Sequence, residues 1–202
     1  YLQKALETYQ ESLEISENIE DRKGVLTSLN NIGVAYDDLG EHKLALTYYD
    51  QALNIATEYD DLEGQQAAIL NIGVAYSELG YGEQALNAFS RAMAIAEDMG
   101  DQHSKGTLYG NIAAVYSDME QYELALDNYE QALAIAREIG DRRGESVLLN
   151  NLGTLSDDEI SLEFLELALA IAIDIGDRSG EALTLHNMAT TYQAMSDYDL
   201  AI

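Results

Sequence analysis

A repeat of about 40 residues is the feature of this sequence that most restricts its fold. A motif that begins with asparagine occurs five times, at Asn31, Asn71, Asn111, Asn151 and Asn187. The first four copies are 40 residues apart and the last follows after 36. A second motif follows the first, as Ala45, Tyr49 and Ala52 show. Such periods are typical of solenoids, in which each unit packs on its neighbours.

Both motifs have the spacing of an amphipathic helix. Ile32, Ala35 and Tyr36 lie three and four residues apart around one face, and Ala45 and Tyr49 do the same in the second motif. Each repeat therefore predicts two helices, called A and B here. One pair cannot bury its apolar stripe alone, whereas stacked pairs can. The absence of proline from all 202 residues fits this all-α interpretation.

Glycines mark the expected helix ends. Gly100, Gly140 and Gly176 follow B motifs, where a left-handed residue ends a helix, and the aspartate after each is placed to cap the next A helix. Gly40 and Gly80 end A helices in the same way. These signals predict one array with a B helix in 1–20, full repeats at 21–60, 61–100 and 101–140, a shortened repeat at 141–176 and a partial repeat at 177–202.

These motifs resemble the tetratricopeptide repeat. Helix A of that family carries leucine-glycine and then tyrosine, matched by Ile32-Gly33 and Tyr36, and helix B carries alanine around an aromatic residue, matched at Tyr49. The resemblance implies a right-handed superhelical solenoid of antiparallel helix pairs, with about five repeats. Repeats of 40 residues that close with glycine-aspartate are similar to those of Partner-of-Inscuteable-type scaffolds and of bacterial regulators.

The fourth repeat departs from this pattern. It lacks four residues between Gly153 and Leu162, about one helical turn, and Ser156 stands where tyrosine is expected. We expect a shortened A helix or an altered turn there. Two interpretations remain open, which are tolerated drift and a functional kink in the groove.

Charge and composition exclude several classes of function. The 37 acidic residues against 10 basic ones give a net charge of −27, which argues against nucleic acid and anionic membranes as partners. There is no apolar stretch long enough to span a membrane and no signal-peptide pattern, so we expect a cytoplasmic protein. The acidity fits either adaptation to high salt or an ordinary acidic protein. Both ends fall inside a repeat, so we expect a fragment.

The residues needed for catalysis or metal binding are not brought together by any motif. There is no cysteine, and His42, His103 and His186 lie in different repeats. We therefore expect no enzyme activity, no cofactor and no metal.

The family resemblance places helix A on the concave face, where the five motif asparagines are expected to hydrogen-bond the backbone of an extended peptide. The alternative is that these amides bond neighbouring helices and shape the scaffold. Further candidate peptide-binding residues are Asn30, Asn150, Asp37, Asp38, Glu78, Asp118, Asp157 and Asp158. The acidic members favour a basic or neutral peptide or protein ligand.

The leading prediction is thus a scaffold for protein–protein interaction that binds a peptide segment in its concave groove. One alternative is the regulatory or sensory arm of a larger bacterial signalling protein, acting as peptide receptor or intramolecular regulator. A third is an array that associates end to end with itself.

Overall fold

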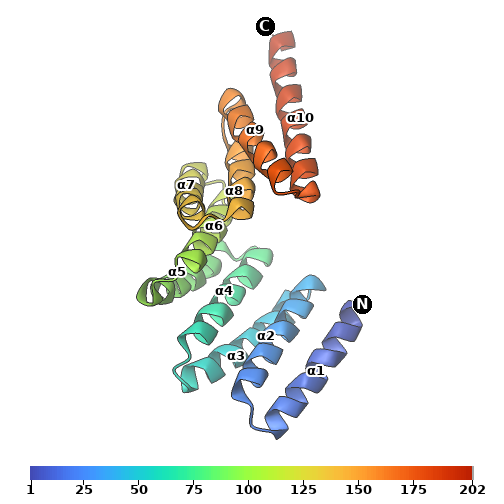
Figure 1. The fold of residues 1–202 in the computed structure, drawn as a ribbon, viewed down its shortest axis with the longest axis vertical. Helices are drawn as coiled ribbons and strands as arrows, with labels where there is room; N and C mark the ends of the chain where they lie inside the picture. Colours follow the sequence, from blue (N-terminus) through green and yellow to red (C-terminus); the bar gives the residue numbers. More distant parts are fainter. Residues whose placement is uncertain (202) are drawn as a thin grey trace. The chain divides into compact units, whose positions relative to one another are not determined.

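The computed structural model describes the backbone of residues 1–201 and the side chains of this range except Asp158 and 197–201. This part of the chain forms ten helices and no strand (Figure 1). The A helices are α2 (Arg22–Asp38), α4 (Leu62–Glu78), α6 (Gln102–Asp118), α8 (Arg142–Leu155) and α10 (Arg178–Ala201). The B helices are α1 (Leu2–Asn18), α3 (His42–Glu58), α5 (Gly82–Met99), α7 (Tyr122–Ile139) and α9 (Asp158–Asp174). The prediction of an all-α helical repeat solenoid is confirmed.

The helices form two compact units, residues 1–100 and 101–202. In the first unit, α1 to α5 pack in chain order, each on the next. In the second unit, α6 to α10 do the same. Tertiary contacts within each unit are therefore made chiefly between helices that are consecutive in the sequence.

An aspartate caps the start of every A helix. One side-chain oxygen accepts the backbone N–H three residues later, at 2.9 to 3.1 Å. The five caps are Asp21, Asp61, Asp101, Asp141 and Asp177. The last three confirm the prediction, whereas the first two were not recognised because no glycine precedes them. Glu20 and Asp60 adopt the left-handed conformation instead, with φ of 57° and 53°.

Glycines end the B helices where predicted. Gly100, Gly140 and Gly176 have φ of 68°, 73° and 70°, a conformation that costs glycine little. Gly40 and Gly80, at the ends of A helices, have φ of 77° and 74°. Each helix end is thus determined by residues within a few positions of it.

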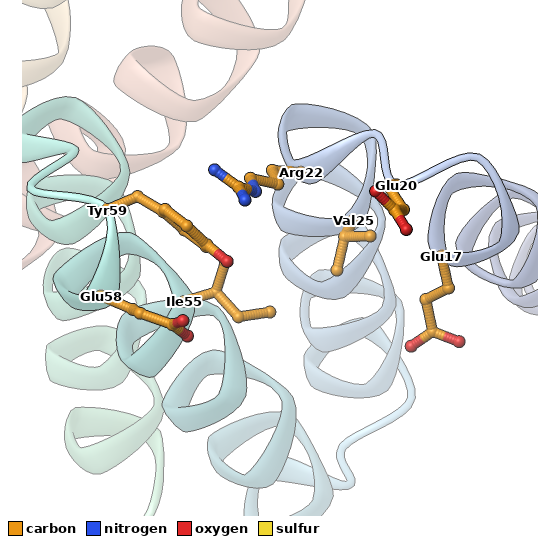
Figure 2. A pocket seen from close by; sticks show the side chains of 7 residues that line it. All are labelled: Glu17, Glu20, Arg22, Val25, Ile55, Glu58 and Tyr59. Atoms are coloured by element: carbon orange, nitrogen blue, oxygen red, sulfur yellow. The ribbon is translucent and has the colours of Figure 1, made fainter.

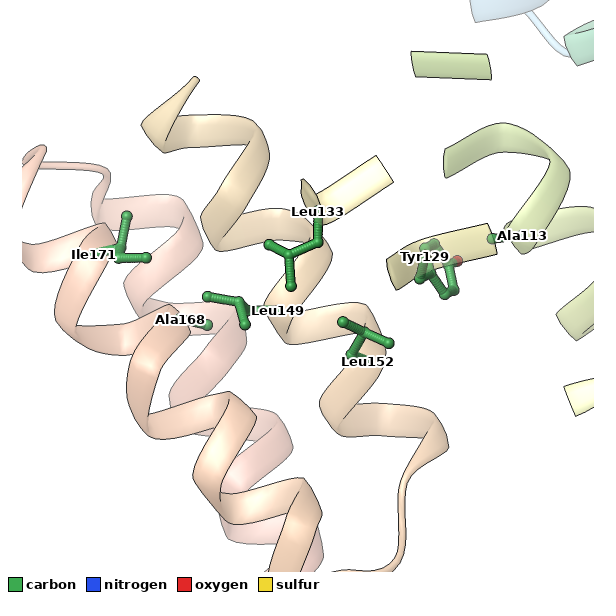
Figure 3. Packing of buried hydrophobic residues seen from close by; sticks show 7 residues of the cluster. All are labelled: Ala113, Tyr129, Leu133, Leu149, Leu152, Ala168 and Ile171. Carbon is green, nitrogen blue, oxygen red and sulfur yellow. The ribbon is translucent and has the colours of Figure 1, made fainter. Parts of the chain in front are cut away.

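The core lies between the A and B helices. Figure 3 shows it in the second unit, where side chains from four helices meet. The cluster consists of Ala113, Tyr129, Leu133, Leu149, Leu152, Ala168 and Ile171. Because α7, α8 and α9 all contribute, the core continues from one repeat to the next.

In the two full repeats of the first unit, the A helix meets a large side chain of the B helix at a glycine. A Cβ atom on Gly33 would collide with the ring of Tyr49, and one on Gly73 with the ring of Phe89. Tyr49 and Phe89 are both 1% exposed. Only a residue without a side chain allows this close approach.

The tyrosines at the repeated motif positions are buried to different degrees. Tyr49 and Tyr129 are buried, and Tyr36, Tyr76 and Tyr116 are half-buried, as packing residues are. Tyr192 is instead 49% exposed. It lies on α10, which packs only against α8 and α9 in the described chain.

The shortened A helix predicted in the fourth repeat is present. Helix α8 has 14 residues, against 17 in α2, α4 and α6. Ser156 follows it in extended conformation, with φ −92° and ψ 161°. Helix α10 has 24 residues and continues through Ser196 without a break. The side chains of residues 197–201 lie outside the described residues.

Replacing Gly73 by alanine tests the close contact between the A and B helices. Gly73→Ala gains about 1 kcal/mol of helix propensity but overpacks the contact with Phe89, which costs about 1–3 kcal/mol. We expect a lower midpoint of thermal unfolding, measured by circular dichroism. Gly110→Ala is the matched control on α6, because its nearest neighbour, Leu148 Cδ2, would lie at 3.7 Å. We expect this variant to unfold at the same or a higher temperature. Equal shifts in both variants would show that the contact is not tight.

Candidate functional site

The five motif asparagines occupy the same register on the A helices. All five are half-buried, so each amide has part of its surface open to a ligand. Asn31 and Asn71 belong to the first unit. Asn111, Asn151 and Asn187 belong to the second.

One of these asparagines bonds a neighbouring helix. Asn187 Nδ2 on α10 donates to Asn150 Oδ1 on α8 at 3.0 Å, and Asn150 is 6% exposed. The scaffold-shaping role therefore holds for this pair. Asn151 also interacts with a buried side chain of the protein. Burial and the charge of Asp118 raise the pKa of Tyr129, and the amide of Asn151 makes this rise smaller.

Asn30 differs from Asn150 although it has the same place in its repeat. Its Oδ1 atom is buried and has no hydrogen-bond partner among the described residues. A buried acceptor without a partner costs about 1–3 kcal/mol, and a donor from a ligand would remove that cost. Gln66 Nε2, on α4, is the other buried polar atom of this kind in the described chain.

Asp37 is engaged inside the first unit. Tyr49 Oη donates to Asp37 Oδ2 at 2.8 Å, and His42 Nδ1 lies 3.0 Å from Oδ1. Burial, followed by this hydrogen bond and the charges of Asp37 and Asp38, raises the pKa of Tyr49 far above its ordinary value. Asp37 thus links α2 to α3 at the A-to-B turn, and its oxygens are already occupied by partners.

The other acidic candidates lie open to solvent. Asp38, Glu78, Asp118 and Asp157 are exposed, each at or near the end of an A helix. The side chain of Asp158 lies outside the described residues. These exposed carboxylates would attract a positively charged ligand to this edge in either unit.

A hollow of about 380 Å3 lies beside Asn31 in the first unit. Residues of α1 and α2 line it, together with the cap Asp21 between them. The lining consists of Tyr9, Ser12, Asp21, Lys23, Gly24, Thr27, Ser28 and Asn31. Asn31 is therefore within reach of a ligand in this hollow.

A second hollow of the first unit, of about 400 Å3, is lined where α1 ends, α2 begins and α3 ends (Figure 2). The guanidinium carbon of Arg22 lies 3.9 Å from the centroid of the Tyr59 ring, a cation–π contact. Val25 and Ile55 provide apolar surface, and Glu17, Glu20 and Glu58 complete the lining. Sequence reasoning missed this hollow, because Arg22 and Tyr59 lie far apart and belong to no motif.

A third hollow, of about 210 Å3, lies in the second unit between α8, α9 and α10. Its lining is Gly153, Thr154, Ser156, Ser161, Asn187, Thr190, Thr191 and Ala194. Asn187 is among the residues predicted from the sequence to bind a peptide. The hollow itself was not predicted, although the deletion and the change from tyrosine to Ser156 both lie at this place.

No group of three or more histidine, aspartate or glutamate residues within the described part of the chain is arranged to hold a metal ion. No helix within residues 1–201 combines the length and apolar character needed to cross a bilayer.

Comparison with protein families gives one match. The model of the tetratricopeptide repeat matches residues 2–58, 65–138 and 104–156. The chain belongs to the tetratricopeptide repeat family. No curated protein sequence matches it. The family assignment therefore rests on the match between the repeats of this chain and the family model.

Solved structures share the tetratricopeptide repeat fold at low sequence identity. BtubC (BKLC) from P. vanneervenii is 19% identical, with a TM-score of 0.84 over 98% of this chain and 86% of that one. A Rap protein complexed with competence and sporulation factor is 17% identical, with a TM-score of 0.72 over 95% and 59%. A signal transduction ATPase with a tetratricopeptide repeat sensor, from Pyrococcus horikoshii, is 18% identical, with a TM-score of 0.72 over 99% and 35%. At these identities the likeness establishes the fold alone.

At one junction between tetratricopeptide repeats, an ion-pair cluster joins α7 to α8. Glu145 Oε1 accepts from Arg137 Nε at 2.8 Å, and Oε2 accepts from Arg142 Nη1. Burial alone would raise the pKa of Glu145, but the hydrogen bonds and charges of the two arginines outweigh it and hold the pKa below its ordinary value. Glu145 is 7% exposed, so its charge depends on these partners.

Neutralising Glu145 tests this cluster. A lowered pKa in the folded state contributes stability above the unfolded pKa of about 4.3, and that stability is lost as the pH falls through the folded-state value. We expect Glu145→Gln to lower the free energy of unfolding at pH 7 by about 1–2 kcal/mol, because the arginines are half-exposed. The difference should fade below about pH 4.

Urea unfolding across this pH range measures the effect. Glu181→Gln is the matched control, since Glu181 also accepts from an arginine three residues before it, Arg178, whose side chain is 85% exposed. We expect it to change stability by less than about 0.5 kcal/mol. A pH-independent effect at Glu145 would contradict the assigned pKa shift.

Proposed function

We propose that this chain is an interaction module without catalytic activity, which holds a peptide segment of a partner protein against its A helices. The observation that carries the proposal is the half-buried asparagine at one register of every A helix in a tetratricopeptide array. An amide offers both a donor and an acceptor, which is what the backbone of an extended peptide requires. Hydrogen bonds to backbone would bind many sequences, so flanking residues would set selectivity.

The first unit offers the best-supported contacts. Asn31 lines the hollow between α1 and α2, and the buried oxygen of Asn30 lacks a donor. A peptide N–H brought to Asn30 would satisfy that oxygen, provided the side chain turns toward the ligand. In the second unit, Asn187 donates one amide hydrogen to Asn150, and its second amide hydrogen and its oxygen remain for a ligand.

The charge of the chain favours a basic or neutral segment. The net charge is −27, and Asp38 and Glu78 are exposed at the ends of α2 and α4. Opposite charge on a partner would raise its association rate and make binding sensitive to salt. An acidic segment would meet repulsion along the same edge.

A regulatory setting is the second candidate. The Rap protein of known structure is complexed with competence and sporulation factor, and the Pyrococcus protein carries its repeats as a sensor. This chain covers 59% and 35% of those chains, which supports a place as one arm of a larger signalling protein. A cytoplasmic location fits such a role.

End-to-end self-association is a third proposal, which a constant monomer mass at two protein concentrations would contradict.

Alanine substitution at Asn31 and Asn71 tests the peptide-binding proposal. Peptides would first be selected on the intact chain from a random display library. Each net hydrogen bond contributes about 0.5–1.5 kcal/mol, so the double variant should bind roughly tenfold more weakly by calorimetry. We expect the selected peptides to be basic or neutral and to bind more weakly at high salt.

The matched control replaces two asparagines on B helices. Asn54 on α3 and Asn87 on α5 are exposed, so Asn54→Ala with Asn87→Ala should leave the affinity unchanged. Unchanged affinity in a folded Asn31→Ala, Asn71→Ala variant would remove these asparagines from the binding site. Equal losses of affinity in both double variants would also remove Asn31 and Asn71 from the binding site.

A further inference from the structure

The hollow in the second unit lies where the fourth repeat is shortened. Tyrosine stands at the corresponding sequence position of the preceding repeats, at Tyr36, Tyr76 and Tyr116, whereas the fourth repeat has Ser156. Helix α8 ends at Leu155, and Ser156 continues as extended chain. The space of about 210 Å3 is below the roughly 300–1,000 Å3 of pockets for drug-sized molecules, and suits one side chain.

The hydroxyl groups on the α8 side of this hollow already donate their protons to backbone carbonyls. Thr154 Oγ1 donates to the carbonyl of Asn151 at 2.7 Å, and Ser156 Oγ donates to that of Leu152 at 2.7 Å. A hydroxyl has one proton and two lone pairs. Both oxygens can therefore only accept a hydrogen bond from a ligand.

The α10 side is arranged in the same way. Thr190 Oγ1 donates to the carbonyl of His186 at 3.1 Å, and Thr191 Oγ1 to that of Asn187 at 3.2 Å. Ser161 Oγ lies 3.2 Å from Thr191 Oγ1, and it is the donor because the proton of Thr191 is already engaged. Ser161 is 3% exposed, so this pair is held firmly. Five hydroxyl oxygens thus present lone pairs to one small space.

The charges around the hollow have one sign. The segments 144–177 and 179–202 contain no lysine or arginine. Asp157 and Glu159 are exposed beside Ser156, where the chain passes from α8 to α9. The potential here is therefore negative, while the lining itself is neutral.

We propose that this hollow binds the guanidinium group of an arginine side chain from a partner. Guanidinium is planar, carries a positive charge and offers five N–H donors with no acceptor, which complements a neutral lining of acceptors in a negative field. An ammonium group is a compact point charge with three donors and matches fewer of these oxygens. The inference rests on the proposed function, since the partner segment bound to the A helices would deliver the side chain.

The test uses N-acetyl-L-arginine amide as probe and isotope-labelled intact chain. We expect saturable shifts of backbone amide signals in Thr154–Ser161 and Asn187–Ala194. The same experiment with the lysine analogue and with the citrulline analogue, which keeps the shape without the charge, should give at least fivefold weaker binding. Equal binding of the citrulline analogue, or shifts spread over the acidic surface, would overturn the proposal.

Two variants locate the binding, and one controls for them. Thr191→Val removes an acceptor at constant shape and should weaken arginine binding about fivefold. Ser156→Tyr restores the tyrosine of the other repeats, fills the space and should abolish binding. Thr8→Val, at an exposed threonine of α1 that also donates to a carbonyl four residues back, should have no effect. Unaltered binding by folded Thr191→Val would overturn the proposal.

This experiment separates the inference from the proposed function. If selected peptides bind without needing arginine and the probe does not map to the hollow, the inference fails and the interaction role stands. If the probe maps to the hollow while no peptide can be selected, the proposed function fails and the guanidinium site stands.

Discussion

In the two full repeats of the first unit, the contact between a glycine of helix A and a ring of helix B determines how the helix pair is arranged. At Gly33 and Gly73 the backbone of the A helix touches the ring of Tyr49 or Phe89, which sets both the separation and the register of the two helices. The motif asparagine comes two residues earlier, so it lies about 200° around the helix from the glycine. It therefore points away from helix B wherever this contact forms. Under the proposed function, this is the side of the A helix that faces the ligand.

The polar groups of the A helices divide into those that serve the fold and those that remain open. Asp37 ties the A-to-B turn of its repeat to Tyr49, and Asn150 receives Asn187 from the next A helix. Asn30, at the register of Asn150, has an oxygen without a partner. The difference arises because Asn150 meets a donor on the following A helix, α10, and Asn30 does not. The same residue type at the same register can therefore be scaffold in one unit and a candidate contact in the other.

Much of the fold could be predicted from the sequence, because its determinants are local. Repeat period, apolar spacing and the glycine-aspartate ends indicate helices that the structure confirms, including the shortened α8. The caps at Asp21 and Asp61 were missed because Glu20 and Asp60 take the left-handed conformation without glycine. The engagement of Asp37 and the hollows depended on contacts between helices. Spacing within one helix gives no information on what its neighbour presents.

The local character of these interactions also bears on how the chain acquires its structure. Caps, turns and glycine contacts are made between residues within one repeat, and each helix packs chiefly on the next one in its unit. Few loops of long sequence separation must close, so the entropic barrier to folding is low and helical arrays of this kind fold within about microseconds to milliseconds. A newly synthesised repeat can therefore become structured as soon as its neighbour has emerged from the ribosome, which shortens the time that its apolar surface is exposed to other chains.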